Sequence, residues 1–497
     1  MQSMTLSAGL AAARERMVLG GLLACFLAIL SVVFLNVWLA KPALWTLLAA
    51  LPALAASPAL ARRLSPGLDG LALRHPLLSM LWLLIAIALM LRFAGLALYM
   101  SNPDLPQGSV FWFDDFYINH SCFSAYWKAD QLAQSNTANI YLLTPYEGME
   151  GRFKLDEFLY PPQFLLLPRA LSWLGLNFLQ MRALWFVLDA LLLAGVMLAL
   201  CAWIGGAVGR RLGLLLPLLW LGFPILITLQ TGNYQVQALA LAVLAMILFE
   251  RNRNLSGGAL MALALFKIFP GILCLVLLLQ KRWRAVGATI AFSLLYLGAG
   301  ALIIGSQHYQ TFLGYQMPRM SSAEHWAWLM LDGLEGVVAI NHSVPALLLK
   351  ARILFGWKDI GMAHVAQLAW LWSLAVIALG AVAGWRLRHA DLPRSQTAAL
   401  WISLLALGAL RSAFVPDDYA MVPMIWLWGI SAAVYWGPQA GRNALLILLW
   451  LACATVLPFA RFDPAQSGVL MLVSTLCQFI TLSLCLWSVC YRRAHQA

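Results

Sequence analysis

Apolar runs of about 17–25 residues recur along this chain from end to end, and each is long enough for a helix that crosses the hydrocarbon core of a bilayer. Only 10% of the residues are charged, whereas soluble domains carry about 25%. The pattern predicts an all-α polytopic membrane protein, because a helix satisfies its own backbone hydrogen bonds in lipid. We expect about twelve spans, near residues 17–40, 43–61, 76–100, 181–204, 212–229, 235–250, 285–305, 362–384, 397–413, 421–436, 443–460 and 468–490.

No separate soluble domain interrupts these spans, so the sequence predicts a single integral membrane domain over residues 1–497. It consists of the first three spans (17–100), a long loop (101–180), further spans (181–305), a second long loop (306–361) and the C-terminal spans (362–497). The stretch "YPPQFLLLPRALSWL" at 160–174 is amphipathic. We expect it to form an amphipathic helix that lies along the membrane interface within the first loop.

Basic residues favour one orientation of the chain. Clusters such as Arg62–Arg63, Arg210–Arg211 and Arg492–Arg493 all fall on one side if both termini are cytoplasmic, which is the distribution that the positive-inside rule describes. This placement explains the net charge of +12 without a nucleic acid partner. Most carboxylates then fall in the two outer loops, which are either simply solvated or the place where the protein carries out chemistry.

The stretch "SGGALMALALFKIFPGILCLVLLLQ" at 256–280 has basic clusters on both sides. One helix cannot keep both ends cytoplasmic, but two half-helices that meet at "FKIFPG" can, since Pro270 and Gly271 interrupt the hydrogen-bond ladder. We therefore expect a broken re-entrant hairpin with Lys267 near its turn. A lysine at membrane depth indicates a functional role, and its natural partner is a phosphate; the alternative is a side chain that extends to the interface.

The stretch "FWFDDFYINH" at 111–120 places Asp114 and Asp115 just after an apolar span. One interpretation is that they are loop carboxylates that cap a helix starting near Phe116. Another is that one of them is a general base at the lipid–water boundary. Metal binding by the pair alone is a weaker alternative, because two carboxylates are too few ligands.

Three further polar segments fall on the expected outer face. "TGNYQVQ" at 231–237 offers Asn233 and Gln235 to sugar hydroxyls, although most such turns are merely solvated. "INHSVPALLLKAR" at 340–352 places a possible helix N-cap, Asn341 or Ser343, before an apolar run. "RSAFVPDDYAM" at 411–421 carries a second aspartate pair.

In this order, the Asp-Phe at 115–116, "IYLLTPY", "YPPQFLLLP", "TGNYQVQALAL", "GGALMALALFKIFPGILCLVLLLQKRWRA" and "NHSVPALLLKAR" resemble the polyprenyl-phosphate-sugar-dependent glycosyltransferases of family 87. These enzymes belong to the GT-C class of integral membrane transferases. His342 replaces the glutamine that is usual in the family's Asn-Gln-Ser element.

The resemblance implies a GT-C-like fold in the bacterial inner membrane, with the active site facing the periplasm. An inverting reaction would move a mannose-like hexose from a polyprenyl phosphate to a hydroxyl of a glycolipid or glycan acceptor. Asp115 or Asp114 would be the base, and neither a cofactor nor a metal is required. Charge on the leaving phosphate would be stabilised by Lys267, with Arg319, Lys350 or Arg352. The other implied substrate contacts are Tyr160, Asn233, Gln235, Asn341, His342, Asp417 and Asp418.

Two alternatives remain open from the sequence. A transporter or flippase of lipid-linked sugars would also contain buried charge and broken helices, but such proteins are often built from internal repeats, and none is visible by eye here. A GT-C transferase that modifies lipid A or transfers an aminosugar is the other alternative.

Overall fold

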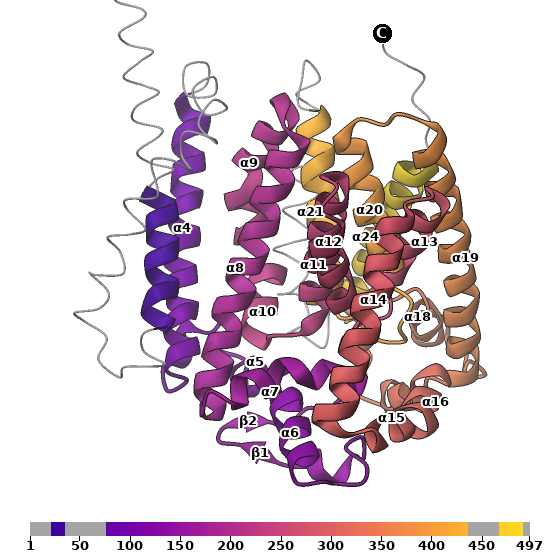
Figure 1. Ribbon diagram of the computed structural model, residues 1–497. Coiled ribbons are helices and arrows are strands. Elements are labelled where there is room, and N and C mark those ends of the chain that lie inside the picture. The colour runs from indigo at the N-terminus through magenta and orange to yellow at the C-terminus, as the bar shows by residue number, and fades with distance from the viewer. Residues whose placement is uncertain (1–20, 35–75, 436–466, 491–497) are drawn as a thin grey trace, which may run out of the picture. The chain divides into compact units, whose positions relative to one another are not determined.

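The computed structural model describes residues 21–34, 76–435 and 467–490. Regular structure in these residues is almost entirely helical (Figure 1), which confirms the all-α class. The exception is a small antiparallel pair, β1 (Met149–Glu150) and β2 (Phe153–Lys154), in which Met149 lies opposite Lys154 and Glu150 opposite Phe153.

Five helices among the described residues are long and apolar enough to cross a membrane, at Met80–Ser101, Phe178–Ile204, Trp283–Gly305, Met362–His389 and Gly468–Cys490. The number is six if the broken pair Phe223–Thr231 and Tyr234–Glu250 counts as one span. The structure thus supports a multi-pass membrane protein but not twelve spans. The spans expected near 43–61 and 443–460 lie outside the described residues, and the first is described only as the helix Gly21–Phe34.

Two features explain why fewer long spans form than the hydropathy predicts: a break at glycine and proline, and a helix that is too short. The span expected at 212–229 divides at Gly222, because Pro224 in the first turn of the next helix has no N–H to continue the ladder. The helix expected at 397–413 extends over Arg394–Ala409, which is 16 residues, or about 24 Å at 1.5 Å per residue. That length is shorter than a hydrocarbon core of about 30 Å.

The chain forms two compact units that alternate along the sequence. Unit 1 comprises Met1–Ser124, Gly148–Asp156 and Ala170–Asn233. Its core contains Phe93, which stacks on Phe26 and Phe186 and makes an edge contact with Trp220. The labelled elements of unit 1 are β1, β2, α4 (Pro76–Ser101), η2 (Pro106–Gly108), α5 (Asp115–Asn119), α8 (Phe178–Ile204), α9 (Gly206–Leu221) and α10 (Phe223–Thr231).

Unit 2 comprises Ala125–Glu147, Glu157–Arg169 and Tyr234–Ala497. Its elements are η3 (Thr144–Tyr146), η4 (Pro162–Leu165), α11 (Tyr234–Glu250), α12 (Asn254–Ala264), α13 (Gly271–Leu279), α14 (Trp283–Gly300), η5 (Ala301–Gly305), α15 (Gln307–Thr311), η6 (Phe312–Gln316), α16 (Met317–Ser321), η7 (Glu324–Met330), α17 (Glu335–Ala339), α18 (Ala346–Phe355), α19 (Met362–His389), α20 (Arg394–Ala409), α21 (Asp417–Tyr435) and α24 (Ser467–Cys490). Two helices, α6 (Phe123–Gln134) and α7 (Leu166–Ser172), cross a unit boundary. The amphipathic segment at 160–174 forms η4 and α7, so its predicted helical character is confirmed.

The predicted break within 256–280 is present. Helix α12 ends at Ala264, α13 begins at Gly271, and Pro270 occupies the N-cap of α13. The two half-helices pack mainly against different partners, α12 against α11 and α14, and α13 against α19 (Figure 1). Gly258 permits the close approach of α12 to α14, because a Cβ atom there would lie 2.7 Å from the carbonyl carbon of Ala288.

Candidate functional site

Lys267 lies in the turn between α12 and α13, where its half-buried side chain meets two other predicted site residues. Its Nζ donates a hydrogen bond to Oε1 of Gln235 at 3.2 Å. The same atom lies 4.9 Å from the centre of the Tyr160 ring, within the range of a cation–π interaction. Unit 2 therefore brings together Tyr160, Gln235 and Lys267, which are far apart in the sequence.

The ring of Tyr160 is held firmly in this position. Its hydroxyl accepts a hydrogen bond from the Tyr126 hydroxyl at 3.1 Å, and its backbone oxygen accepts one from the Tyr141 hydroxyl at 2.9 Å. Phe164 stacks on the ring with the centroids 4.5 Å apart. The Tyr126 hydroxyl in turn accepts from the backbone N–H of Tyr234. Because these contacts fix the Tyr160 ring, they also define the position of the Lys267 ammonium group that contacts it.

Asp114 and Asp115 lie at the start of α5 in unit 1. Asp114 is the N-cap, and its Oδ1 accepts a hydrogen bond from the Phe116 N–H at 2.8 Å, so the capping interpretation of this residue is confirmed. Asp115 is the first residue of the helix and is exposed. Three aromatic side chains close to it in the sequence are also exposed: Trp112 (57%), Phe113 (50%) and Phe116 (57%). The exposed carboxylate of Asp115 thus has exposed aromatic residues as its neighbours in the sequence.

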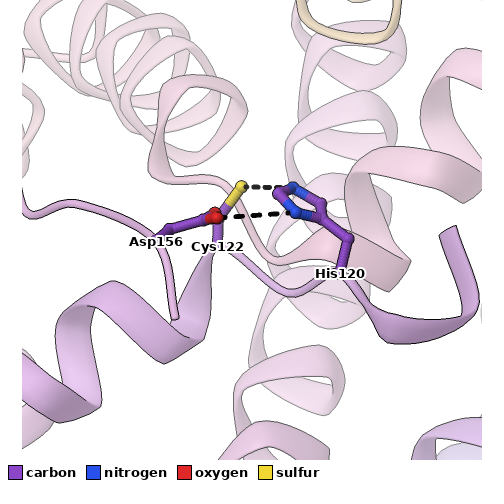
Figure 2. A group of neighbouring side chains, drawn as sticks. All are labelled: His120, Cys122 and Asp156. Carbon is purple, nitrogen blue, oxygen red and sulfur yellow. Dashed lines mark hydrogen bonds and ion pairs between the residues drawn. The ribbon is translucent and has the colours of Figure 1, made fainter. Parts of the chain in front are cut away.

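A second polar group in unit 1 comprises His120, Cys122 and Asp156 (Figure 2). One ligand atom from each residue lies within 4.8 Å of the other two. Sequence reasoning missed this group, because Asp156 is far from the other two residues in the chain. The signal that could have indicated it is the His-x-Cys spacing at 120–122.

Asn233 belongs to unit 1 as well, and its Nδ2 donates to Sγ of Cys122 at 3.4 Å. The preceding Gly232 has a φ of +72° and ends α10. Its carbonyl oxygen accepts a hydrogen bond from the indole N–H of Trp185 at 3.0 Å. The polar turn predicted at 231–237 is therefore packed against neighbouring side chains, and its Asn233 is directed to a thiol.

Asn341 and His342 pair with the segment that precedes α21. The side chain of Asn341 donates to the Ala413 oxygen at 2.8 Å and accepts from the Val415 N–H at 3.0 Å. Both Asn341 and His342 are completely buried. Burial, with Lys350 nearby, lowers the pKa of His342 to about 3, so the imidazole is neutral. These contacts indicate a structural role for Asn341.

Just before α18, the Oγ of Ser343 accepts a hydrogen bond from the N–H of Ala346, the first residue of that helix, at 3.1 Å. The N-cap position of α18 is occupied by Pro345, so neither Asn341 nor Ser343 is the N-cap that the sequence suggested. Asp417 and Asp418 begin α21, and Asp418 is buried. The first-turn position of Asp418 is one in which a carboxylate is stabilised by the N–H groups and dipole of the helix.

The other predicted cations have protein partners in unit 2. Lys350 is 2% exposed and donates to Oγ of Ser474 at 2.9 Å. Arg352 donates to the carbonyl oxygens of Lys358 and Ile360. Both side chains therefore make their polar contacts within the fold around α18.

Arg319 lies in a network centred on Glu157, a residue that sequence reasoning missed. Its guanidinium donates to Oε1 of Glu157 at 3.2 Å, and Nδ1 of His325 lies 3.3 Å from Oε2 of the same carboxylate. Burial raises the pKa of Glu157, but the two basic neighbours outweigh it and leave the pKa below its ordinary value. Glu157 is therefore ionised at neutral pH and forms an ion pair with Arg319.

The helical architecture with several long apolar helices defines a polytopic membrane protein. A family model described as glycosyltransferase family 87 matches residues 158–412, which is just over half of the 497 residues. The chain belongs to this family and is a membrane glycosyltransferase. Comparison with curated proteins and with solved structures gives no match.

The matched region contains Tyr160, Asn233, Gln235 and Lys267, together with the predicted residues between 319 and 352. It ends before Asp417 and begins after both Asp114 and Asp115. The cationic part of the predicted site thus lies in the segment that defines the family, whereas the aspartate pairs lie outside that segment.

Proposed function

We propose that this glycosyltransferase uses a polyprenyl-phosphate-linked sugar, a mannose-like hexose, as its donor. The sugar is transferred with inversion to a hydroxyl of a glycolipid or glycan acceptor. The observation that carries this proposal is the position of Lys267, a cation at the break of two half-helices inside the family's matched segment. Irregular backbone at membrane depth occurs where it lines protein or a wet cavity, and a phosphate on a membrane-anchored chain is a fitting partner for a lysine there.

The chemistry of the leaving group supports a role for Lys267 in the reaction. A sugar linked to a polyprenyl phosphate is a phosphodiester with one negative charge, and its departure leaves a phosphate monoester that gains a second. A cation held next to this phosphate therefore binds the transition state more tightly than the donor, which is the condition for catalysis. Tyr160 and Gln235 position the ammonium group for this purpose.

Asp115 is the base in this proposal. Asp114 already accepts the hydrogen bond that caps α5, whereas the Asp115 side chain is exposed and can meet an acceptor. In the reaction the carboxylate removes the proton of the acceptor hydroxyl as its oxygen attacks the anomeric carbon. The bond from that carbon to the phosphate oxygen breaks, and the polyprenyl phosphate departs with the electron pair.

We further propose that the enzyme lies in the bacterial inner membrane with both termini in the cytoplasm and the reaction on the periplasmic face. The support is the distribution of arginine and lysine along the chain and the location of most carboxylates in the loops at 101–180 and 306–361. Lipid-linked donors do not need to leave the membrane to reach such a site.

The test is a reconstituted transfer assay with the purified full-length protein in detergent. A polyprenyl-phospho-hexose is supplied with a glycolipid acceptor, and the matched control contains the nucleotide-activated form of the same sugar. We expect product only with the lipid-linked donor, with an anomeric configuration opposite to that of the donor. Product from the nucleotide sugar alone would refute the donor class. Retention of configuration would refute the direct displacement.

The transporter alternative is tested on the same preparation in vesicles. Movement of the lipid-linked sugar across the bilayer without formation of a glycoside would favour it over the proposal. Lys267→Ala provides a further test. If the protein is a transferase, this variant should form much less glycoside product while remaining folded.

A further inference from the structure

A thiol, an imidazole and a carboxylate converge in unit 1 from two separate segments. His120 and Cys122 follow α5, and Asp156 follows β2 (Figure 2). Nε2 of His120 lies 3.6 Å from Sγ of Cys122, and Nδ1 lies 3.6 Å from Oδ1 of Asp156. The proposed transfer reaction uses none of the three side chains.

We propose that His120, Cys122 and Asp156 form a binding site for a divalent transition-metal ion of the Zn²⁺ class. Nitrogen, sulfur and oxygen are the donors that Zn²⁺ prefers, and three protein ligands leave a fourth position open. A thiolate and a carboxylate together balance the two positive charges of the ion.

The three ligand atoms lie near the separations of a tetrahedral site, and a rearrangement of the side chains would complete it. Bond lengths of about 2.0–2.3 Å from zinc to these donors place neighbouring ligand atoms roughly 3.3–3.6 Å apart. The sulfur and the carboxylate oxygen each lie 3.6 Å from the imidazole, but from different ring nitrogens, and the set with one ligand atom from each residue lies within 4.8 Å. A metal binds one ring nitrogen, so the imidazole must also turn until a single nitrogen faces both other ligands.

A metal-free catalytic triad of the same residue types has a different shape. In such a triad the thiol and the carboxylate bind opposite nitrogens of the imidazole, which places them roughly 7–8 Å apart when both hydrogen bonds are about 3 Å long. Here the sulfur and the carboxylate oxygen lie within 4.8 Å of each other. The sulfur and the carboxylate oxygen thus lie closer together than in a triad, as a shared metal ion requires, although their 3.6 Å contacts are to different ring nitrogens.

The backbone around the three ligands is already organised. His120 forms a β-bridge with Lys154. The hydroxyl of Ser124 donates to the Lys154 oxygen at 2.9 Å and accepts from the Asp156 N–H at 3.1 Å. These bonds tie the two segments together, so the ligands are held near each other before a metal binds.

Neighbouring side chains orient the ligands themselves. The ring of Phe116 stacks on the imidazole of His120 with the centroids 4.5 Å apart. The amide of Asn233 donates to the sulfur of Cys122, as outer-shell groups commonly do for metal-bound ligands. The cluster therefore has both an inner set of donors and a supporting set around it.

The first experiment is a Co²⁺ titration of the full-length protein in detergent, after treatment with a chelator. Co²⁺ occupies zinc sites, and a bond to a thiolate gives a charge-transfer band in the near ultraviolet. We expect saturable binding of about one ion per chain, with the band lost in Cys122→Ser and retained in Cys201→Ser, a control at a buried cysteine of α8. Asn233→Ala should weaken binding about 10- to 100-fold.

The second experiment measures alkylation of Cys122 in the same protein. Bound Zn²⁺ should protect this thiol, and a chelator should restore its reaction. His120→Gln provides a second ligand variant that should lose protection while keeping the thiol. A reaction rate that is unchanged by Zn²⁺, or a cobalt band that survives Cys122→Ser, would overturn the proposal; a fast rate insensitive to metal would instead favour the metal-free thiol–imidazole pair.

Discussion

Replacing Lys267 by alanine removes the one charge that we assign to the leaving phosphate. The side chain is half-buried, with its Nζ held between Oε1 of Gln235 and the ring of Tyr160. An effective dielectric constant of about 20 is appropriate to such a site, and two unit charges about 4 Å apart then interact by about 4 kcal/mol.

This interaction energy of about 4 kcal/mol applies to the charge that develops on the phosphate during the reaction. The departing phosphate gains about one negative charge, so the transition state loses up to about 4 kcal/mol more than the bound donor when Lys267 is absent. Because 1.36 kcal/mol corresponds to a tenfold change in rate, the expected loss in kcat is about 10²- to 10³-fold. The donor itself also carries a charge, so its KM should rise, while the KM of the acceptor should change little.

The assay is steady-state transfer with each substrate varied in turn. Lys267→Arg keeps the charge and should recover part of the activity. Gln235→Ala removes a hydrogen-bond partner but not the charge, and should cost less than about tenfold. Lys358→Ala changes an exposed lysine of the same unit and should have no effect. Equal losses for donor and acceptor, or wild-type turnover in Lys267→Ala, would refute the phosphate role.

Three further predictions concern the base, a buried charge and helix packing. Asp115→Asn should reduce turnover by about 10²- to 10⁴-fold, as expected for loss of a general base. Asp114→Asn keeps a side chain that can cap α5 and should remain active. The reverse pattern in the transfer assay would assign the base to Asp114. Burial lowers the pKa of Lys350 to about 7, so between about pH 7 and 10.5 the unfolded chain binds a proton that the folded chain does not, and stability should rise with pH in this window. Lys350→Met should abolish that rise and stabilise the protein at neutral pH, as measured by thermal unfolding in detergent; an unchanged pH profile would contradict the argument. Gly258→Ala should destabilise the protein by about 1–3 kcal/mol, because the added Cβ would press on the α14 backbone. Gly287→Ala on α14, where a Cβ meets nothing within 4 Å, should be neutral or stabilising by up to about 1 kcal/mol. Similar shifts in melting temperature for both variants would exclude the close helix contact as the cause.

Local features of the fold could be predicted from the sequence because they depend on neighbouring residues. A proline followed by a glycine, as at Pro270 and Gly271, disfavours the continuation of a helix, and the break between Ala264 and Gly271 is where the prediction placed it. Asp114 caps α5 through a bond to a residue two positions away. The family was also predictable, since its motifs are read in order along the chain.

The number of long spans was less predictable. Hydropathy reports how apolar a segment is, but it does not separate a helix that crosses lipid from a shorter one enclosed by other helices. Helix α20 is almost completely buried along its 16 residues, so its apolar character serves packing against α21 and α24. Such packing supports short helices that would not cross a bilayer alone.

The roles of charged residues depended on the tertiary structure. From the sequence, Lys267 is the main candidate for a phosphate contact, and Lys350 is one of several further candidates. In the structure Lys350 is enclosed and bound to Ser474, while Lys267 lies at the helix break beside Tyr160. The difference arises from residues more than a hundred positions away in the chain, which a local pattern does not contain.

The amino-acid sequence by itself determined that this protein is a helical membrane protein of glycosyltransferase family 87, because composition, helix breaks and ordered motifs are properties of nearby residues. Only the tertiary structure decided that Tyr160, Gln235 and Lys267 meet, and that Cys122 and His120 lie against Asp156. Contacts of this kind depend on how the helices and loops pack. Many different packings are compatible with the same local pattern, and the side-chain contacts of the whole chain select one of them.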